Sequence, residues 1–167
     1  MTLFPQHLTQ LAEAVLAEAR KRGLRIATAE SCTGGLIAGC LTEIAGSSDV
    51  VDRGFITYSN DAKVQHIGVQ PGTIEKSGAV SAEVALEMAQ GALKASKAHI
   101  AVSATGIAGP GGATDTKPVG LVYIGIANGK TGNSFTLKNM FGGDRSAVRL
   151  ETVETALTAL KKEIETA

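Results

Sequence analysis

Aromatic residues are scarce in this sequence: they make up 4% of 167 residues, and tryptophan is absent. Neither sign of charge is in excess, because 16 basic residues balance 16 acidic ones. Nucleic-acid-binding proteins usually carry a basic surface, so the balance argues against nucleic acid as a partner. No apolar run approaches the ~20 residues of a membrane-spanning helix, and the amino terminus lacks the pattern of a signal peptide. We therefore expect neither nucleic acid nor a membrane as a partner.

Cysteine and histidine are also few, which limits disulfide and metal chemistry. Cys32 and Cys40 form no CxxC pair, and this usage predicts a soluble protein of a reducing compartment, the cytoplasm. His7, His66 and His99 lie far apart, and none has a second ligand at the spacing of a metal site. We expect no metal and no cofactor.

The length and the 44% apolar content are typical of a single globular domain, so we expect one α/β domain over residues 1–167. Apolar runs predict strands over 24–27, 53–59, 99–104 and 119–127, and a further one through Phe135 and Phe141. Apolar spacing and capping residues predict helices before Gly23, over about 33–45, around Lys63 and from Ser81 to about Lys97, and a last helix that carries Val153, Leu157, Leu160 and Ile164 at helical spacing. Strands alternating with helices, with one hairpin at the end, indicate a layered domain with a mixed sheet.

The segment 28–35, TAESCTGG, is the strongest candidate for a functional site. It lies between a predicted strand and a predicted helix, where backbone N–H groups of a helix start suit anion binding and an oxyanion hole. Ser31 and Cys32 are both candidate nucleophiles, although Cys32 is equally typical of a small buried apolar residue. Ala29 and Thr33 stand where a G-x-S-x-G motif requires glycine, so an α/β-hydrolase elbow is not supported.

A serine nucleophile needs a base, and no histidine here has a suitable context. Lysine is the other known option. Lys63, on the short helix predicted after a strand, could take this role if burial or nearby cations lowered its pKa. Tyr58 and Ser59, at the end of that strand, could orient or relay protons. Taken alone, however, Lys63 is more typical of a solvated surface lysine beside Asp61.

Residues 105–118 form a glycine-rich loop between two apolar strands. The loop is longer than most connections, and such loops are usually functional or disordered. Its GIAGPGG segment does not match the dinucleotide fingerprint G-x-G-x-x-G, and the sequence contains no P-loop motif. Backbone N–H groups of the loop could still bind a phosphate. A flexible crossover is about equally compatible with the sequence.

Considered together, these segments resemble the C-terminal domain family of the competence/damage-inducible protein CinA. The resemblance rests on TAESCTGG, the IAGSS and RGFITYSNDAK block, GAVS, ATGIAGPGG, KPVGLVYIGIA and FGGDR, which follow one another in this order. It extends from about Leu8 to the last helix and makes the chain look like the stand-alone form of the family. The resemblance implies a three-layer α/β/α sandwich with a mixed, mostly parallel sheet including one antiparallel hairpin. It also implies a homodimer.

Stand-alone members of that family are nicotinamide-nucleotide amidohydrolases, so the resemblance also implies a reaction. The carboxamide of nicotinamide mononucleotide, a small pyridine mononucleotide, would be hydrolysed to the carboxylate of nicotinic acid mononucleotide, with release of ammonia, as part of NAD recycling. Ser31 would be the nucleophile and Lys63 its base, with Tyr58 beside the lysine.

We expect the substrate to be bound by two groups of residues. The first surrounds the nucleophile and comprises Glu30, Cys32, Thr33, Gly34 and Gly35. The second contains two alternatives for the 5′-phosphate: the loop 105–112, with Thr105, Gly106 and Gly109, or Arg145 after Gly142-Gly143, since arginine suits bidentate phosphate contacts. Pairing of Arg145 with Asp144 at a helix start is nearly as compatible with the sequence.

Two other functions remain open at the level of sequence. One is an amidase or redox enzyme that uses Cys32 as its nucleophile. The other is a non-catalytic module that binds a nucleotide or a partner, because a fold alone never establishes chemistry.

Overall fold

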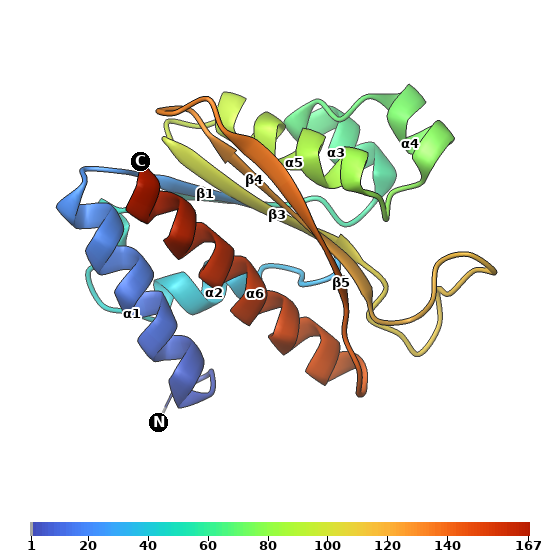
Figure 1. Ribbon diagram of the computed structural model, residues 1–167, viewed down its shortest axis with the longest axis horizontal. Coiled ribbons are helices and arrows are strands. Elements are labelled where there is room, and N and C mark those ends of the chain that lie inside the picture. The colour runs from blue at the N-terminus through green and yellow to red at the C-terminus, as the bar shows by residue number, and fades with distance from the viewer. Residues whose placement is uncertain (1) are drawn as a thin grey trace.

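The computed structural model describes residues 2–167, which form a five-stranded mixed sheet with helices on both faces (Figure 1). The strands are β1 (Ile26–Glu30), β2 (Val51–Ile56), β3 (Ile100–Gly106), β4 (Leu121–Asn128) and β5 (Ser134–Met140). The helices are α1 (Gln6–Lys21), α2 (Leu36–Thr42), α3 (Asn60–Ile67), α4 (Pro71–Ser77), α5 (Ala82–Lys94) and α6 (Arg145–Thr166), with a 3₁₀ turn at Ser47–Asp49. Helices α1, α2 and α6 cover one face, and α3, α4 and α5 cover the other, which confirms the three-layer sandwich.

The strand order is β2-β1-β3-β4-β5, and β1 is parallel to both of its neighbours. The two remaining pairs, β3 with β4 and β4 with β5, are antiparallel. The antiparallel part therefore exceeds the single hairpin that the sequence predicted. The reason is the connection between β3 and β4: it contains no helix, and a parallel return of the chain usually requires one.

Small residues let the layers approach closely, as expected for a core with few aromatics. All five residues of β1 are buried, because helices cover both of its faces. A Cβ added to Gly91 of α5 would lie 1.8 Å from the carbonyl oxygen of Ile67, and one added to Gly125 of β4 would lie 2.3 Å from that of Ala85. Only glycine fits at these two contacts, so α5 is held tightly between α3 and the sheet. Within residues 2–167, no helix combines the length and the apolar character needed to cross a membrane.

One correction to the predicted boundaries concerns the turn after β1. The strand predicted over 24–27 lies at Ile26–Glu30, and the helix predicted over 33–45 shortens to Leu36–Thr42. Gly34 and Gly35 adopt left-handed backbone with φ of 57° and 99°, which delays the helix start. At the next element, Ser59 caps α3, since its side chain accepts the N–H of Ala62.

Candidate active site

A cavity of about 280 Å³ lies at the carboxyl ends of the parallel strands. The chain passes from β1 to β2 on one side and then to β3 on the other side of β1, so the strand order reverses at β1. Crevices at such reversals are where open α/β sheets bind ligands. The residues lining the cavity are Ser31, Cys32, Tyr58, Asn60, Lys63, Ala79, Val80, Thr105, Gly106, Ala108, Gly109, Gly111 and Arg145.

Ser31 is the first residue after β1, and the sheet holds its backbone in place. Its N–H donates to the carbonyl of Ala104 in β3 over 2.9 Å. Its hydroxyl oxygen accepts a hydrogen bond from the Lys63 ammonium nitrogen, and the Nζ–Oγ separation is 3.0 Å. The structure therefore brings together a candidate nucleophile and its candidate base from two neighbouring strand ends.

Lys63 lies in the first turns of α3 and is 1% exposed. Its Nζ also donates to the carbonyl oxygens of Thr57 at 2.8 Å and Tyr58 at 3.4 Å. Among residues 2–167 no carboxylate forms an ion pair with it. Burial without a counter-charge lowers the pKa of Lys63 to about 8. In the neutral amine two N–H groups can donate to the carbonyls, and the hydrogen bond with Ser31 is then reversed, with the hydroxyl donating to the lone pair of the lysine.

Glu30 does not contribute to the cavity, contrary to its predicted substrate contact. Its carboxylate is fully buried and accepts the N–H groups of Gly35, Ile37 and Ala38 at 3.1, 3.0 and 2.8 Å. The hydroxyl of Thr33 donates to the same carboxylate at 2.6 Å. Glu30 thus satisfies the free N–H groups at the start of α2, and this helix terminus is not available to an oxyanion.

Thr33, Gly34 and Gly35 likewise build the turn rather than the cavity wall. Thr33 is fully buried, and Gly34 donates its N–H to the carbonyl of Ser31 at 3.0 Å. Cys32, in contrast, lines the cavity, although only 6% of it is exposed. Burial raises the pKa of its thiol to about 11, which disfavours the thiolate that a cysteine nucleophile needs.

The Tyr58 hydroxyl does not contact Lys63, although Tyr58 was predicted to lie beside that lysine. It accepts a hydrogen bond from Arg145 Nη2 at 3.3 Å, whereas Lys63 contacts only the backbone carbonyl of Tyr58. Arg145 Nη1 donates to the carbonyl of Gly109 at 2.8 Å. Tyr58 and Arg145 therefore form one wall of the cavity together with the glycine-rich loop. Asp144, the alternative partner of Arg145, instead caps α6 through the N–H of Ala147.

The glycine-rich loop continues this wall, and Thr105, Gly106 and Gly109, the residues predicted to hold the phosphate, all line the cavity. The Thr105 hydroxyl donates to the carbonyl of Ala79 at 2.8 Å, which joins this wall to the segment before α5. A Cβ on Gly106 would lie 2.6 Å from a methyl of Val122, so the strand end tolerates only glycine.

Sequence reasoning missed three of the lining residues, Asn60, Ala79 and Val80, and it did not single out Ala108 and Gly111 within the glycine-rich loop. Ala79 and Val80 belong to the GAVS segment, one of the motifs that carry the family resemblance, and their own side chains are apolar and give no sign of a site. Within residues 2–167, no three His, Cys, Asp or Glu side chains are grouped to hold a metal ion.

Comparison with known proteins gives one consistent family. A profile of the CinA C-terminal domain matches residues 8–164. The nicotinamide-nucleotide amidohydrolase PncC of Escherichia coli K12 is 50% identical over 153 residues, which cover 92% of each chain. A competence-damage inducible protein of Caldicellulosiruptor saccharolyticus is 54% identical over 154 residues, and the chain spans 37% of the length of that relative.

Solved structures agree with the sequence comparison. The crystal structure of competence/damage inducible protein CihA from Agrobacterium tumefaciens superposes with a TM-score of 0.95 at 51% identity, covering 99% of both chains. A CinA superfamily protein from Klebsiella pneumoniae superposes with a TM-score of 0.92 at 34% identity, covering 97% of this chain and 100% of that one.

Proposed function

The chain belongs to the CinA C-terminal domain family, and from that premise we propose that it is an enzyme that hydrolyses the carboxamide of nicotinamide mononucleotide. The products are nicotinic acid mononucleotide and ammonia, which places the reaction in pyridine nucleotide recycling. Relatives named nicotinamide-nucleotide amidohydrolase match 92% of the chain at 50% identity, which supports this substrate. The single observation that carries the mechanism is the 3.0 Å contact between Lys63 Nζ and Ser31 Oγ in the cavity.

The reaction begins with neutral Lys63 taking the proton of Ser31 as its Oγ attacks the amide carbon. The carbonyl π electrons move to oxygen and give a tetrahedral oxyanion. When the C–N bond breaks, the lysine ammonium returns its proton to the leaving nitrogen, so ammonia departs and an acyl ester remains on Ser31. Water, deprotonated by the same lysine, then releases the carboxylic acid and restores the serine hydroxyl.

The oxyanion needs donors other than the start of α2, because Glu30 already accepts those N–H groups. We assign it to the backbone N–H of Cys32, which directly follows the nucleophile and belongs to a residue that lines the cavity. Loss of one oxyanion donor typically slows such reactions by about 10²–10³-fold. Cys32 thus contributes its backbone, and its thiol is not needed.

The 5′-phosphate is assigned to the opposite side of the cavity, between Arg145 and the glycine-rich loop. The Arg145 guanidinium is held by Gly109 and Tyr58, so its plane is fixed before any substrate arrives. Arginine in a fixed orientation suits a phosphate dianion.

Formation of a homodimer stays a prediction, which light scattering in solution tests directly.

Ammonia release from nicotinamide mononucleotide tests the proposal. We expect turnover by the wild type, a loss of at least about 10³-fold in Ser31→Ala, and a rate within about threefold of wild type in Cys32→Ala. The reverse order of the two variants would establish the cysteine mechanism instead. Binding of the mononucleotide by calorimetry without any turnover would establish a non-catalytic module.

A further inference from the structure

Arg149 contacts the turn that carries the nucleophile, although it is absent from the cavity wall. It lies one helical turn after Arg145 in α6. Its Nε donates to the carbonyl of Cys32 at 3.2 Å, and its Nη2 donates to the carbonyl of Thr33 at 3.1 Å. One guanidinium therefore binds two successive carbonyls of a segment 116 and 117 residues away in sequence.

The charge of Arg149 is directed at this backbone. Among residues 2–167 no carboxylate forms an ion pair with Arg149. Hydrogen bonds from a charged donor are stronger than neutral ones, and the planar fork of a guanidinium matches two neighbouring acceptors. A lysine at this position would offer the charge without the fork.

Holding two carbonyls fixes the orientation of two peptide groups. A peptide group is planar and trans, so its N–H points opposite to its carbonyl. The Cys32 and Thr33 carbonyls thus determine where the N–H groups of Thr33 and Gly34 point. The latter closes the turn on the Ser31 carbonyl. The glycines that follow are conformationally permissive, so the turn is not held by its local sequence alone.

The place of α6 does not depend on Arg149. Val148, Thr152 and Val153, which surround it in the helix, are all fully buried, and they anchor this part of α6 in the core. Removing the guanidinium should therefore release the turn and leave the helix where it is.

We propose that Arg149 is a positioning residue of the reaction, because it holds the turn that sets Ser31 Oγ against Lys63 and the Cys32 N–H against the oxyanion. The role rests on the proposed function for its substrate and for its chemical step. A displacement of about 1 Å in such a geometry can slow a reaction about 10²-fold. Substrate binding, assigned to Arg145 and the glycine-rich loop, is not affected.

Steady-state kinetics with nicotinamide mononucleotide tests this role in three variants. Arg149→Met keeps the apolar stem, Arg149→Lys keeps the charge, and Lys162→Met removes a charge from an exposed position of the same helix. We expect kcat to fall about 10- to 100-fold in Arg149→Met with KM within threefold, partial recovery in Arg149→Lys, and no change in Lys162→Met. Thermal denaturation of each variant checks that it is folded.

Amide hydrogen exchange of the segment 31–37 separates this proposal from the proposed function. Arg149→Met should exchange faster than wild type in this segment, while α6 itself keeps its protection. A wild type that releases no ammonia from the mononucleotide would overturn the proposed function, and the exchange result would still decide the role of Arg149. Unchanged exchange, or a full kcat in Arg149→Met, would overturn that role alone.

Discussion

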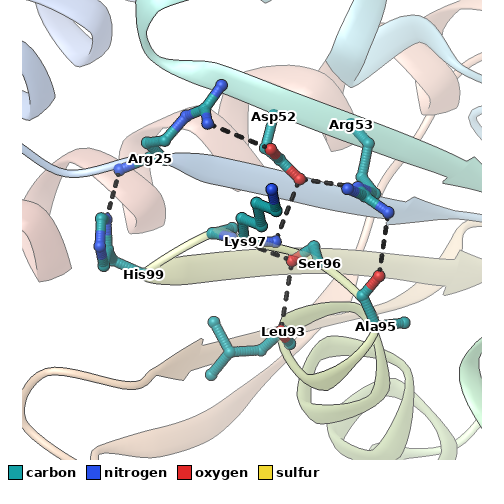
Figure 2. Close-up of polar contacts among 9 residues, drawn as sticks. Arg25, Asp52, Arg53, Leu93, Ala95, Ser96, Lys97 and His99 are labelled. Carbon is teal, nitrogen blue, oxygen red and sulfur yellow. Dashed lines mark hydrogen bonds and ion pairs between the residues drawn. The ribbon is translucent and has the colours of Figure 1, made fainter.

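The two ends of the parallel strands β2, β1 and β3 both carry buried or half-buried charged groups. At the amino ends these groups pair with opposite charges, and at the carboxyl ends the buried lysine has no opposite charge beside it. At the amino ends, Asp52 accepts hydrogen bonds from Arg53 Nε at 2.7 Å and from the Lys97 N–H at 3.2 Å, and it pairs with Arg25 at 3.4 Å (Figure 2). The ring nitrogen Nδ1 of His99 accepts the Arg25 N–H at 2.9 Å. At the carboxyl ends, Lys63 is buried with two carbonyls and one hydroxyl as its partners.

The presence or absence of an opposite charge decides whether a buried group such as Asp52 or Lys63 stays charged or can lose its charge and react. Burial alone would raise the pKa of Asp52, but the hydrogen bonds from Arg53 and Lys97 and the charges of the two arginines outweigh it and lower the pKa. Lys63 has no such compensation, so burial shifts its pKa toward neutrality. A charge that is paired stays charged and stabilises the fold, whereas an unpaired buried lysine is ready to lose its proton and act as a base.

The comparison predicts its largest effect for Lys63→Met. Ammonia release should fall at least about 10³-fold, because the variant lacks the base that we propose for Ser31. The free energy of unfolding should be unchanged or higher, because an apolar side chain avoids the cost of burying an amine. Chemical denaturation and the ammonia assay measure both quantities. Lys97→Met makes the same change at the exposed side chain at the other end and should keep full activity; loss of activity there would contradict the division between the two ends.

Asp52→Asn should show the converse, a loss of stability with activity retained. The side chain of Asp52 is 6% exposed, and an amide in its place turns an N–H group toward one of its donors. We expect the free energy of unfolding to fall by about 1–3 kcal/mol in urea denaturation. Asp49→Asn is the matched control, because Asp49 pairs with Arg20 at the surface, where solvent screens the pair, and its loss should change stability little. Equal losses in the two variants would remove the distinction.

The pH dependence of the rate should follow Lys63. Since its pKa is about 8 and the base must be neutral, kcat/KM should rise about tenfold between pH 7 and pH 9 and then level off. The free energy of unfolding should also rise with pH from about 8 toward the ordinary lysine pKa of 10.5, because only the unfolded state still binds the proton there. A rate that is flat from pH 7 to pH 9 would show that Lys63 is not the group that limits the reaction.

The smallest effect is expected for Thr57→Val. The hydroxyl of Thr57 is buried without a hydrogen-bond partner among residues 2–167, while its carbonyl binds Lys63. Valine has the same shape, so both the free energy of unfolding and kcat should change little, within about 0.5 kcal/mol and twofold. A marked fall in kcat would show instead that this hydroxyl takes part in the chemistry beside Lys63.

Local patterns in the sequence located the turn that carries Ser31 but not the hydrogen bonds that its residues make. The apolar run before Ser31 and the glycine pair after it marked a turn with polar residues, and that turn does lie at the cavity. Glu30 was misassigned because the strand was placed too early and the helix was begun at Thr33. The left-handed glycines shift the helix start, and only then do the N–H groups of α2 meet the Glu30 carboxylate.

Lys63 and Arg149 show a different limit of prediction from sequence, because their partners are distant along the chain. Nothing in the residues around Lys63 distinguishes it from a surface lysine, and only the family resemblance selected it. Arg149 carries no local signal beyond its place one turn after Arg145. Their partners, Ser31 for one and the carbonyls of Cys32 and Thr33 for the other, are distant in sequence and become neighbours only through the sheet and the return of α6.

The sequence by itself determined the layered α/β fold, because the alternation of apolar strands and amphipathic helices is encoded residue by residue. It also determined the family, through motifs that run along nearly the whole chain. The tertiary structure alone decided that Lys63 is buried without a counter-charge, that the start of α2 is filled by Glu30, and that Arg149 holds the turn after Ser31. The physical reason is that desolvation and the allocation of hydrogen-bond donors depend on which distant segments meet, and local sequence does not specify that meeting.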